Sequence, residues 1–324
     1  MAGSSRRNEI ILHQTNTLNA MLQLKTAGYK ALDQLRSQGE FPPEWTKIDE
    51  LEGVTNRFME RFRDERFEVS KELGPGFFVP EMIDRMIRTD DAERMDDASA
   101  DGRDRLEWVR ALDRMNHMTL AYAHQCDLLM PLIAGLARNG RPVGILELAA
   151  GSGGLAFALA ERARLTGVEV SITASDIVPE MVSEGNRLAE ERNLPVSFRR
   201  LNAFDFEGIE PGSVDLVVIS QSLHHFTPGQ LALMIAQAEL HGASAFVGID
   251  GYRSLLLFGG VPLVAALQGI TAFTQDGLTS ARKFFSEIEL DIITAIATRR
   301  LEHCVTCSWP LTVLHAPLKP SAGA

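Results

Sequence analysis

The sequence predicts an α/β protein in which a helical N-terminal region precedes a seven-stranded, mostly parallel sheet. From Pro142 onward, short apolar runs alternate with helical segments, as in βαβ units. Before that point the patterns are helical throughout. A glycine-rich turn, Gly151 to Gly154, directly follows the first apolar run. We therefore expect residues 1–140 to form the helical region, as a lid or a dimer contact, and residues 141–324 to form the sheet domain.

Four helical segments are expected before the sheet. The first covers residues 8–38 and ends ahead of two prolines, which cannot continue a helix. Apolar residues at four-residue spacing predict an amphipathic helix over 54–73. A third segment begins at Pro80, and one long helix is expected over 105–137.

Seven strands are expected in the second part of the chain. Their predicted ranges are 143–149, 168–175, 195–201, 214–220, 244–250, 299–304 and 309–316. Helices begin near Gly153, Pro179 and Pro228, and Thr227 before the last of these is a good N-cap. Another helix covers 287–297. The last two strands are expected to pair antiparallel.

Composition limits the partners. The chain has 324 residues and a formal net charge of −11, whereas a protein that grips nucleic-acid phosphates normally has a basic surface. A nucleic-acid partner is therefore not expected. Three cysteines fit a reducing compartment, and the first residues lack the apolar core of a secretory signal, which predicts a cytoplasmic location. The single CxxC motif, Cys304 to Cys307, has no second pair that would indicate zinc.

The apolar segment 254–273 is long enough to span a bilayer. However, Gly259, Gly260, Pro262 and Gln268 interrupt it, and it lies inside an α/β pattern. We expect an apolar lid, a substrate wall or a dimer surface at this segment, and no membrane span.

The glycine-rich turn predicts a ligand site. Glycines let the backbone leave the strand sharply and approach a ligand above a helix N-terminus. By itself the turn is ambiguous, because Gly151, Gly153 and Ala156 also satisfy a dinucleotide-binding pattern. Glu147 lies inside the preceding strand, four residues before Gly151. Its carboxylate suits a cationic amino group and would repel a pyrophosphate, which counts against a nicotinamide-dependent oxidoreductase.

Four motifs in chain order resemble those of class I (Rossmann-like) methyltransferases that use S-adenosyl-L-methionine (SAM). They are Glu147 with Gly151-Ser152-Gly153, Asp176-Ile177 with the following Pro179, Asn202-Ala203-Phe204, and Ser220 leading to His224-His225. The resemblance covers residues 143–250. It implies SAM as the cofactor, bound by Glu147, Gly151, Ser152, Gly153, Asp176, Ile177, Asn202, Ala203, Phe204 and Ser220.

The resemblance also implies individual roles in cofactor binding. Glu147 would reach the methionyl ammonium, and Asp176 would accept the ribose hydroxyls. Asn202 stands where the family usually has Asp, but its carbonyl oxygen can still accept from the adenine amino group. The Ala203 N–H would meet a ring nitrogen, and Phe204 would lie against the adenine face.

Two adjacent histidines are the candidate catalytic residues. A base is needed when the acceptor loses a proton, and an imidazole with a pKa near neutrality would suit. We expect His224 to be this base and His225 to pack or cap. A metal is not expected, because neighbouring histidines seldom converge on one ion and no third ligand is evident.

Flanking segments resemble a bacterial group of the same class that is often associated with small aromatic, polyketide-like acceptors. They are Glu93 to Asp97, Leu112 to His117, Asp250 to Ser254 and Asp276 to Arg282. His117, Asp250 and Arg253 are tentative acceptor contacts, although Asp250 and Arg253 equally suit an ion pair. The expected acceptor is a small apolar or aromatic metabolite, with oxygen as the expected methylated atom and carbon and nitrogen left open.

Two alternatives remain open at this point. The N-terminal helices suit a docking module for a peptide or protein acceptor, and they equally suit a homodimer contact. The cofactor motifs would also be present in a non-catalytic SAM-binding protein.

Overall fold

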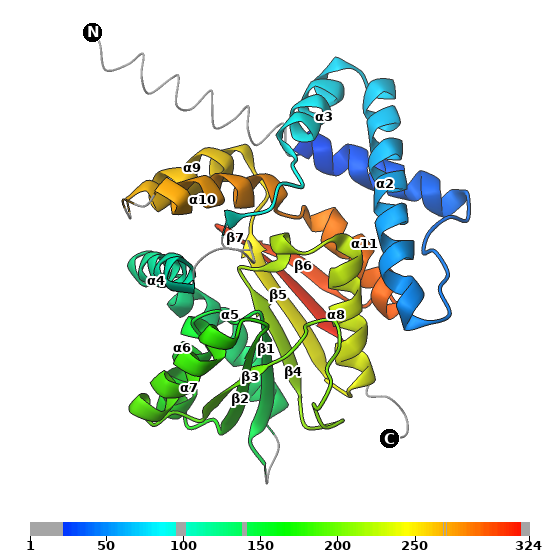
Figure 1. Cartoon of the computed structure of the whole chain (residues 1–324). Helices are drawn as coiled ribbons and strands as arrows, with labels where there is room; N and C mark the ends of the chain where they lie inside the picture. The colour runs from blue at the N-terminus through cyan, green and yellow to red at the C-terminus, as the bar shows by residue number, and fades with distance from the viewer. Residues whose placement is uncertain (1–21, 95–101, 138–140, 268, 270, 319–324) are drawn as a thin grey trace.

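The computed structural model describes residues 22–94, 102–137, 141–267, 269 and 271–318 (Figure 1). Its centre is a seven-stranded sheet with the order β3-β2-β1-β4-β5-β7-β6. The strands are β1 (Val143–Leu148), β2 (Val170–Asp176), β3 (Val196–Arg200), β4 (Leu216–Ser220), β5 (Ala245–Gly251), β6 (Cys304–Ser308) and β7 (Leu311–Pro317).

The sheet confirms the predicted fold class. Neighbouring strands from β3 to β5 are parallel, and β7 runs antiparallel to both β5 and β6. The predicted range 299–304 for the sixth strand was wrong, because Arg299 adopts a left-handed conformation that ends α11 (Glu287–Thr298), and β6 starts only at Cys304. The last strand starts at Leu311, since residues 309–310 form the turn between β6 and β7.

Helices cover both faces of the sheet, because alternate strand residues point to opposite sides. Ile145 belongs to the hydrophobic core with α5 (Ala121–Leu136), α6 (Gly154–Thr166) and α7 (Pro179–Arg192). Leu146, the next residue, belongs to the core with α8 (Pro228–Leu240) and α11 on the other face. The starts of α7 and α8 at their prolines were predicted and are confirmed.

The N-terminal helices extend the second of these cores. The helix over residues 22–37 and α2 (Ile48–Glu72) pack on α8 and α11, and buried side chains such as Leu35 and Phe62 join the same hydrophobic core. In Figure 1 these helices and α3 (Pro75–Ile87) stand beside the carboxyl ends of the strands. Because α5 covers the opposite face, residues 1–140 contribute helices to both sides of the sheet.

Two predicted helical segments were wrong in detail. The expected single helix over 105–137 is two helices, α4 (Gly102–Met118) and α5, separated where Leu120 has a φ of 57°. The third helix begins at Pro75 and not at Pro80, which lies inside it. Residues 8–21 of the first predicted helix lie outside the described residues.

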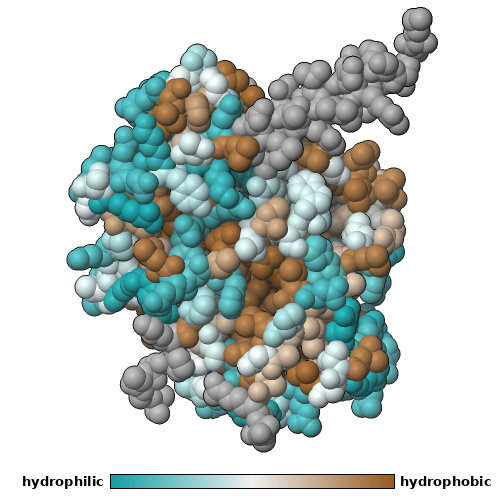
Figure 2. All heavy atoms as spheres, turned by 180° about the vertical axis from the view of Figure 1, so that it is seen from behind, coloured by the Kyte–Doolittle hydropathy of each residue, from teal (hydrophilic) through white to brown (hydrophobic). Residues whose placement is uncertain are grey.

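The apolar segment forms two paired helices, α9 (Leu255–Ala266) and α10 (Thr271–Lys283). Leu256 and Leu263 on the first, and Leu267 directly after it, are all more than half exposed. Seen from behind, hydrophobic residues gather on that side of the molecule (Figure 2). Within the described part of the chain, no helix is both long and apolar enough to cross a membrane.

Candidate active site

A cavity of about 1030 Å³ lies at the carboxyl ends of β1, β2 and β4, where ligands bind in open α/β sheets. Most of the predicted site residues line it. They are Glu147, Gly151, Ser152, Asp176, Ile177, Phe204, Ser220, His224 and His225. Gly153, Asn202, Ala203, His117, Asp250 and Arg253 do not line it.

Gly151 and Gly153 each occupy a position that the local structure explains. The Gly151 N–H donates to Asp176 Oδ2 at 2.9 Å, which joins the ends of β1 and β2. Gly153 has a φ of 76°, and a Cβ there would lie 2.1 Å from the ring of Phe198. Gly153 therefore shapes the turn by packing and does not face the cavity.

Glu147 is a buried carboxylate with an unpaired oxygen. Its side chain lines the cavity, only 4% of the residue is exposed, and Oε2 has no hydrogen-bond partner among the described residues. Burial, with a smaller contribution from the charge of Asp176, raises the pKa of Glu147 to about 8. A cationic group beside it would restore the charged form and satisfy the free oxygen. The site therefore fits a ligand with an ammonium group.

Two further buried side chains present unpaired polar atoms to the same cavity. Ser220 Oγ and both amide atoms of Gln125 have no hydrogen-bond partner in the part of the chain that the structure describes. Gln125 is fully buried on α5. Sequence reasoning missed it, because a glutamine inside a helical pattern belongs to no motif.

Asp176 lines the cavity, whereas Asn202, in the segment after β3, does not. Asp176 accepts from the N–H groups of Gly151 and Val178, both at 2.9 Å, and burial raises its pKa. Each carboxylate oxygen keeps a second lone pair for a ligand hydroxyl. Asn202 is exposed, and its Oδ1 accepts from the Phe204 N–H at 3.1 Å. The adenine contacts of Asn202 and Ala203 stay predictions, whereas Phe204 lies on the cavity wall.

His224 lies between two carboxylates. Its Nδ1 is 2.8 Å from Asp250 Oδ2, and its backbone N–H donates to the same oxygen at 2.9 Å. On the other side, His224 Nε2 is 3.4 Å from Glu93 Oε1. The side chain of His225 is more exposed, and its Nε2 lies 3.8 Å from Glu93 Oε2.

These carboxylates change the expected state of His224. Burial alone would lower its pKa, but Asp250 and then Glu93 outweigh burial and raise the pKa to about 10. Burial would raise the pKa of Glu93, yet His224, His225 and Lys283 together lower it to about 2. The two carboxylates therefore favour the protonated form of His224, whereas a base that titrates near neutrality was expected at this position.

Glu93 is the shared partner of this cluster. The ligand atoms of Glu93, His224 and His225 lie within 4.8 Å of one another, so a third possible metal ligand is present, contrary to expectation. The same carboxylate accepts from Ser280 Oγ at 2.8 Å and lies 3.7 Å from Lys283 Nζ. Its charge is thus already balanced by cations of the protein.

The tentative acceptor contacts need correction. His117 is exposed, lies 3.7 Å from Asp113 and is not among the residues that line this cavity, although its ring packs edge-on against Tyr122, which is one of them. Its neighbour Asn116 faces the cavity and exchanges two hydrogen bonds with Gln221, at 2.7 and 3.1 Å.

Asp250 and Arg253 also act from behind the cavity wall. Asp250 orients His224, as described above. Arg253 forms an ion pair with Asp84 at 2.8 Å and donates to the carbonyl oxygens of Arg282 and Phe284, both at 2.9 Å. Arg253 was expected to contact the acceptor or to form an ion pair, and the structure shows the ion pair.

Comparison with known proteins decides the class. Residues 145–241, from β1 to the end of α8, match the family model of a methyltransferase domain. The chain carries a Rossmann-like methyltransferase domain. SAM is the cofactor of this class, and the unpaired Glu147 carboxylate beside the glycine turn fits its cationic end.

Two relatives extend the comparison. The 3-methylorcinaldehyde synthase tropA of Talaromyces stipitatus is 32% identical over 155 residues, which is 46% of this chain and 6% of that much longer protein. The solved CMeT domain of the citrinin polyketide synthase aligns with a TM-score of 0.50 and 13% identity, over 83% of this chain and 69% of that domain. The second likeness is one of fold.

Proposed function

We propose that this methyltransferase transfers the methyl group of SAM to a hydroxyl oxygen of a small aromatic or polyketide-like acceptor. The observation that carries the proposal is the unpaired carboxylate of Glu147 in the cavity of a methyltransferase domain. SAM supplies the methyl group on a positively charged sulfur. Much of the acceleration can then come from holding the acceptor in place and excluding water.

The cofactor half of the cavity is assigned by its free polar groups. Glu147 binds the ammonium group, with Gln125 and Ser220 as neutral partners for the same end of the molecule. Asp176 accepts the ribose hydroxyls. Phe204, whose ring lies 5.6 Å from that of Phe226 at a steep angle, offers an aromatic face for the adenine.

The two histidines divide the work at the acceptor. Protonated His224, fixed by Asp250, holds the Glu93 carboxylate and acts as a positioning residue. His225 lines the cavity with a more exposed ring and takes the proton of the acceptor hydroxyl.

The acceptor class is supported by both the cavity and the relatives. Val109, Leu112 and Phe285 line the cavity together with Phe226, which suits an apolar or aromatic molecule. The sequence relative is named as a 3-methylorcinaldehyde synthase, and the structure of similar fold is a domain of a polyketide synthase.

Calorimetry with SAM, S-adenosylhomocysteine (SAH) and NADH tests the cofactor assignment. We expect SAM and SAH to bind in the micromolar range and NADH not to bind. Glu147→Gln should weaken SAM binding about tenfold or more, because a charge-assisted bond is lost. Glu190→Gln, at an exposed position on α7, is the matched control. Binding of NADH, or no binding of SAM and SAH, would refute the proposal.

A second test separates the histidines once an acceptor is found among small phenols. His225→Ala should lower kcat about 100-fold and leave SAH affinity unchanged, in line with the usual contribution of a general base. His224→Gln should change the pH profile of kcat. A loss of kcat in the His224 variant alone would return the role of base to His224.

We further propose that the N-terminal helices close the cavity and provide a homodimer contact. Arg63 of α2 and Arg88 after α3 both reach the cavity wall. The net charge of −11 supports an acceptor other than nucleic acid, and the cysteine content supports the cytoplasm. Light scattering at several protein concentrations tests the dimer.

A further inference from the structure

The charged residues on the cavity wall are separated by sign. Glu147 and Asp176 belong to the wall at the glycine turn. Four cationic residues belong to the wall formed by α2, the segment after α3 and α10, and we call it the basic wall. It consists of Arg63, Arg88, Arg282 and Lys283. Asp90, whose side chain is on the exposed surface, is the one carboxylate that this segment adds to the described cavity lining.

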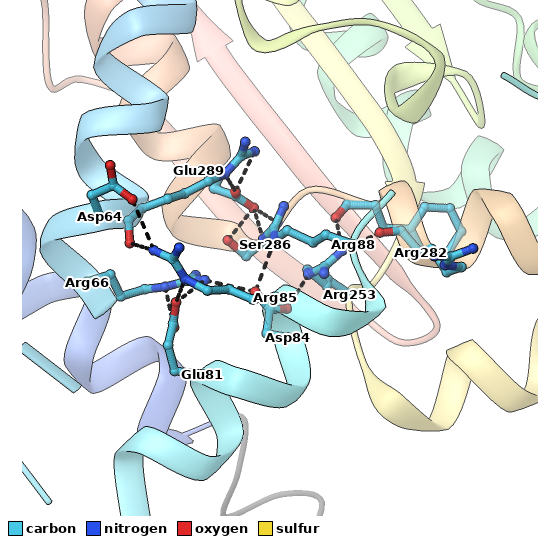
Figure 3. Close-up of polar contacts among 12 residues, drawn as sticks. Asp64, Arg66, Glu81, Asp84, Arg85, Arg88, Arg253, Arg282, Ser286 and Glu289 are labelled. Carbon is cyan, nitrogen blue, oxygen red and sulfur yellow. Dashed lines mark hydrogen bonds and ion pairs between the residues drawn. The ribbon is translucent and has the colours of Figure 1, made fainter. Parts of the chain in front are cut away.

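A buried ion-pair network supports the basic wall (Figure 3). Glu289 binds Arg63 at 3.0 Å and Arg88 at 2.9 Å, and Asp84 binds Arg88 at 3.1 Å. The network as a whole has five arginines, Arg63, Arg66, Arg85, Arg88 and Arg253, around three buried carboxylates, Glu81, Asp84 and Glu289. Asp64, which is 74% exposed, adds a fourth carboxylate at 3.4 Å from Arg85. The carboxylates therefore do not balance the arginines.

Several donors of the basic wall remain free. Arg63 and Arg88 use Nε and Nη2 for the network, and Arg282 uses Nε for the Ile87 carbonyl oxygen at 2.7 Å. Among the described residues, each of these guanidinium groups keeps a terminal nitrogen without a hydrogen-bond partner, and Arg282 Nη1 forms only a long ion pair, at 3.8 Å, with the exposed carboxylate of Asp91. The ion pair of Lys283 with Glu93 is long, at 3.7 Å.

The basic wall lies next to the histidines. Lys283 and His224 contact the same oxygen of Glu93, at 3.7 and 3.4 Å. The carbonyl of Phe284 is held by the network through Arg253, and the Phe284 ring packs edge-on against His224 with centroids 5.0 Å apart. Lys283 therefore places the α10 end of the basic wall in the acceptor half of the cavity.

We propose that the basic wall binds an anionic group of the acceptor, a carboxylate or a phosphate ester. Guanidinium forks with free N–H groups pair well with either anion, and the largely buried Lys283 adds a point charge. This inference rests on the proposed function, because it names the chemical class of the molecule methylated in the same cavity: an aromatic or polyketide-like acid.

The test uses two fluorescent probes that differ by one anionic group. The probe 8-anilino-1-naphthalenesulfonate carries a sulfonate, and N-phenyl-1-naphthylamine lacks it. We expect the wild-type protein to bind the sulfonate at least about tenfold more tightly. The double substitution Arg282→Gln with Lys283→Gln should remove this preference and leave the affinity for the neutral probe unchanged. These two residues are chosen because neither forms an ion pair with the buried carboxylates Glu81, Asp84 and Glu289, and Arg187→Gln, exposed on α7, is the control.

Competition identifies the anion. Displacement of the sulfonate probe by salicylate but not by salicylamide indicates a carboxylate site, and displacement by phenyl phosphate but not by phenol indicates a phosphate site. Equal affinity for the two probes, or an unchanged preference in the double variant, would overturn the inference.

SAH affinity in the same variants separates this inference from the proposed function. We expect the double variant to keep wild-type SAH affinity. A loss of SAH affinity would overturn the inference, because the basic wall would then hold the carboxylate of the cofactor. If no variant bound SAH while the probe preference persisted, the methyltransferase proposal would fail and the anion site would stand.

Discussion

Gly154 packs against Tyr122, and only a residue without a side chain fits there. A Cβ at this position, the first residue of α6, would lie 2.1 Å from the Tyr122 hydroxyl. That hydroxyl donates to Asp113 Oδ1 at 2.9 Å and accepts from Asn116 Nδ2 at 3.3 Å. The glycine thereby allows α4 and α5 to be joined beside the cavity.

Gly154→Ala should lower the free energy of unfolding by about 1–3 kcal/mol, the usual cost of overpacking. It should also weaken SAH binding, because Tyr122 lines the cavity. Urea denaturation and calorimetry measure the two effects. Gly135→Ala on α5 has no atom within 4 Å of the new Cβ and should be neutral or stabilise by up to about 1 kcal/mol. Equal behaviour of the two variants would refute this packing argument.

The raised pKa of Glu147 predicts a pH dependence of stability without ligand. The group titrates near 8 in the folded protein and near 4.5 when unfolded. Between these values the folded state keeps a proton that the unfolded state has lost, so the contribution to stability falls as pH rises and levels off above 8. Thermal melting between pH 5 and 9 should show a steeper fall in the wild type than in Glu147→Gln. Parallel profiles would argue that Glu147 is ionised throughout.

Helices and strands with local signals were predicted well. Thr227 before Pro228 predicted the start of α8, and its hydroxyl accepts from the Gln230 N–H at 3.2 Å. The division between α4 and α5 was missed, because leucine is a good helix former and nothing near Leu120 signals a left-handed residue. Such a break is imposed by packing, which a local pattern does not contain.

Replacing Leu120 with glycine tests this interpretation of the break. A left-handed conformation costs a residue with a side chain about 1–2 kcal/mol, and Leu120 is 69% exposed, so little packing is lost. Leu120→Gly should be neutral or stabilise by up to about 1 kcal/mol in urea denaturation. The control Leu263→Gly, 68% exposed inside α9, should destabilise by about 1 kcal/mol. Destabilisation by both substitutions would place Leu120 in an ordinary helix.

Across the whole molecule, the cofactor half of the site was more predictable than the acceptor half. The cofactor motifs follow successive strands of a parallel sheet, so their order in the chain fixes their meeting point. The acceptor half joins Glu93, Asp250 and the basic wall from α2, the segment after α3 and α10. These segments are far apart in the chain and have no shared pattern, so neither the charge of His224 nor the basic wall could be predicted.

Glu289 connects the N-terminal helices to the sheet domain. It is fully buried, binds Arg63 and Arg88, and accepts from the backbone and hydroxyl of Ser286 at the start of α11. These cations hold the pKa of Glu289 well below its usual value despite burial. The carboxylate therefore stays ionised at neutral pH, and its contribution to stability is lost only as pH falls through that low pKa.

Glu289→Ala should cost about 3–5 kcal/mol, because it leaves Arg63 without its buried partner and Arg88 with Asp84 alone. Urea denaturation monitored by circular dichroism measures the loss. Glu68→Ala removes an exposed pair with Lys71 and should cost less than about 1 kcal/mol. A small effect at Glu289 would show that helix packing alone joins the two parts of the molecule.

The separation of charge along the cavity restricts which atom of an anionic acceptor can react. When a methyl group passes from a sulfonium to an anionic atom, both charges diminish as the transition state forms and are gone in the products. A wall that stabilised the reacting anion would favour the reactants over the transition state and slow the reaction. A wall that binds an anion elsewhere on the acceptor attracts that anion equally in the reactants and in the transition state. Its effect is then only to position the acceptor. The anionic group that binds the basic wall should therefore not be the group that reacts. The methylated atom should belong to a different, neutral group of the same molecule.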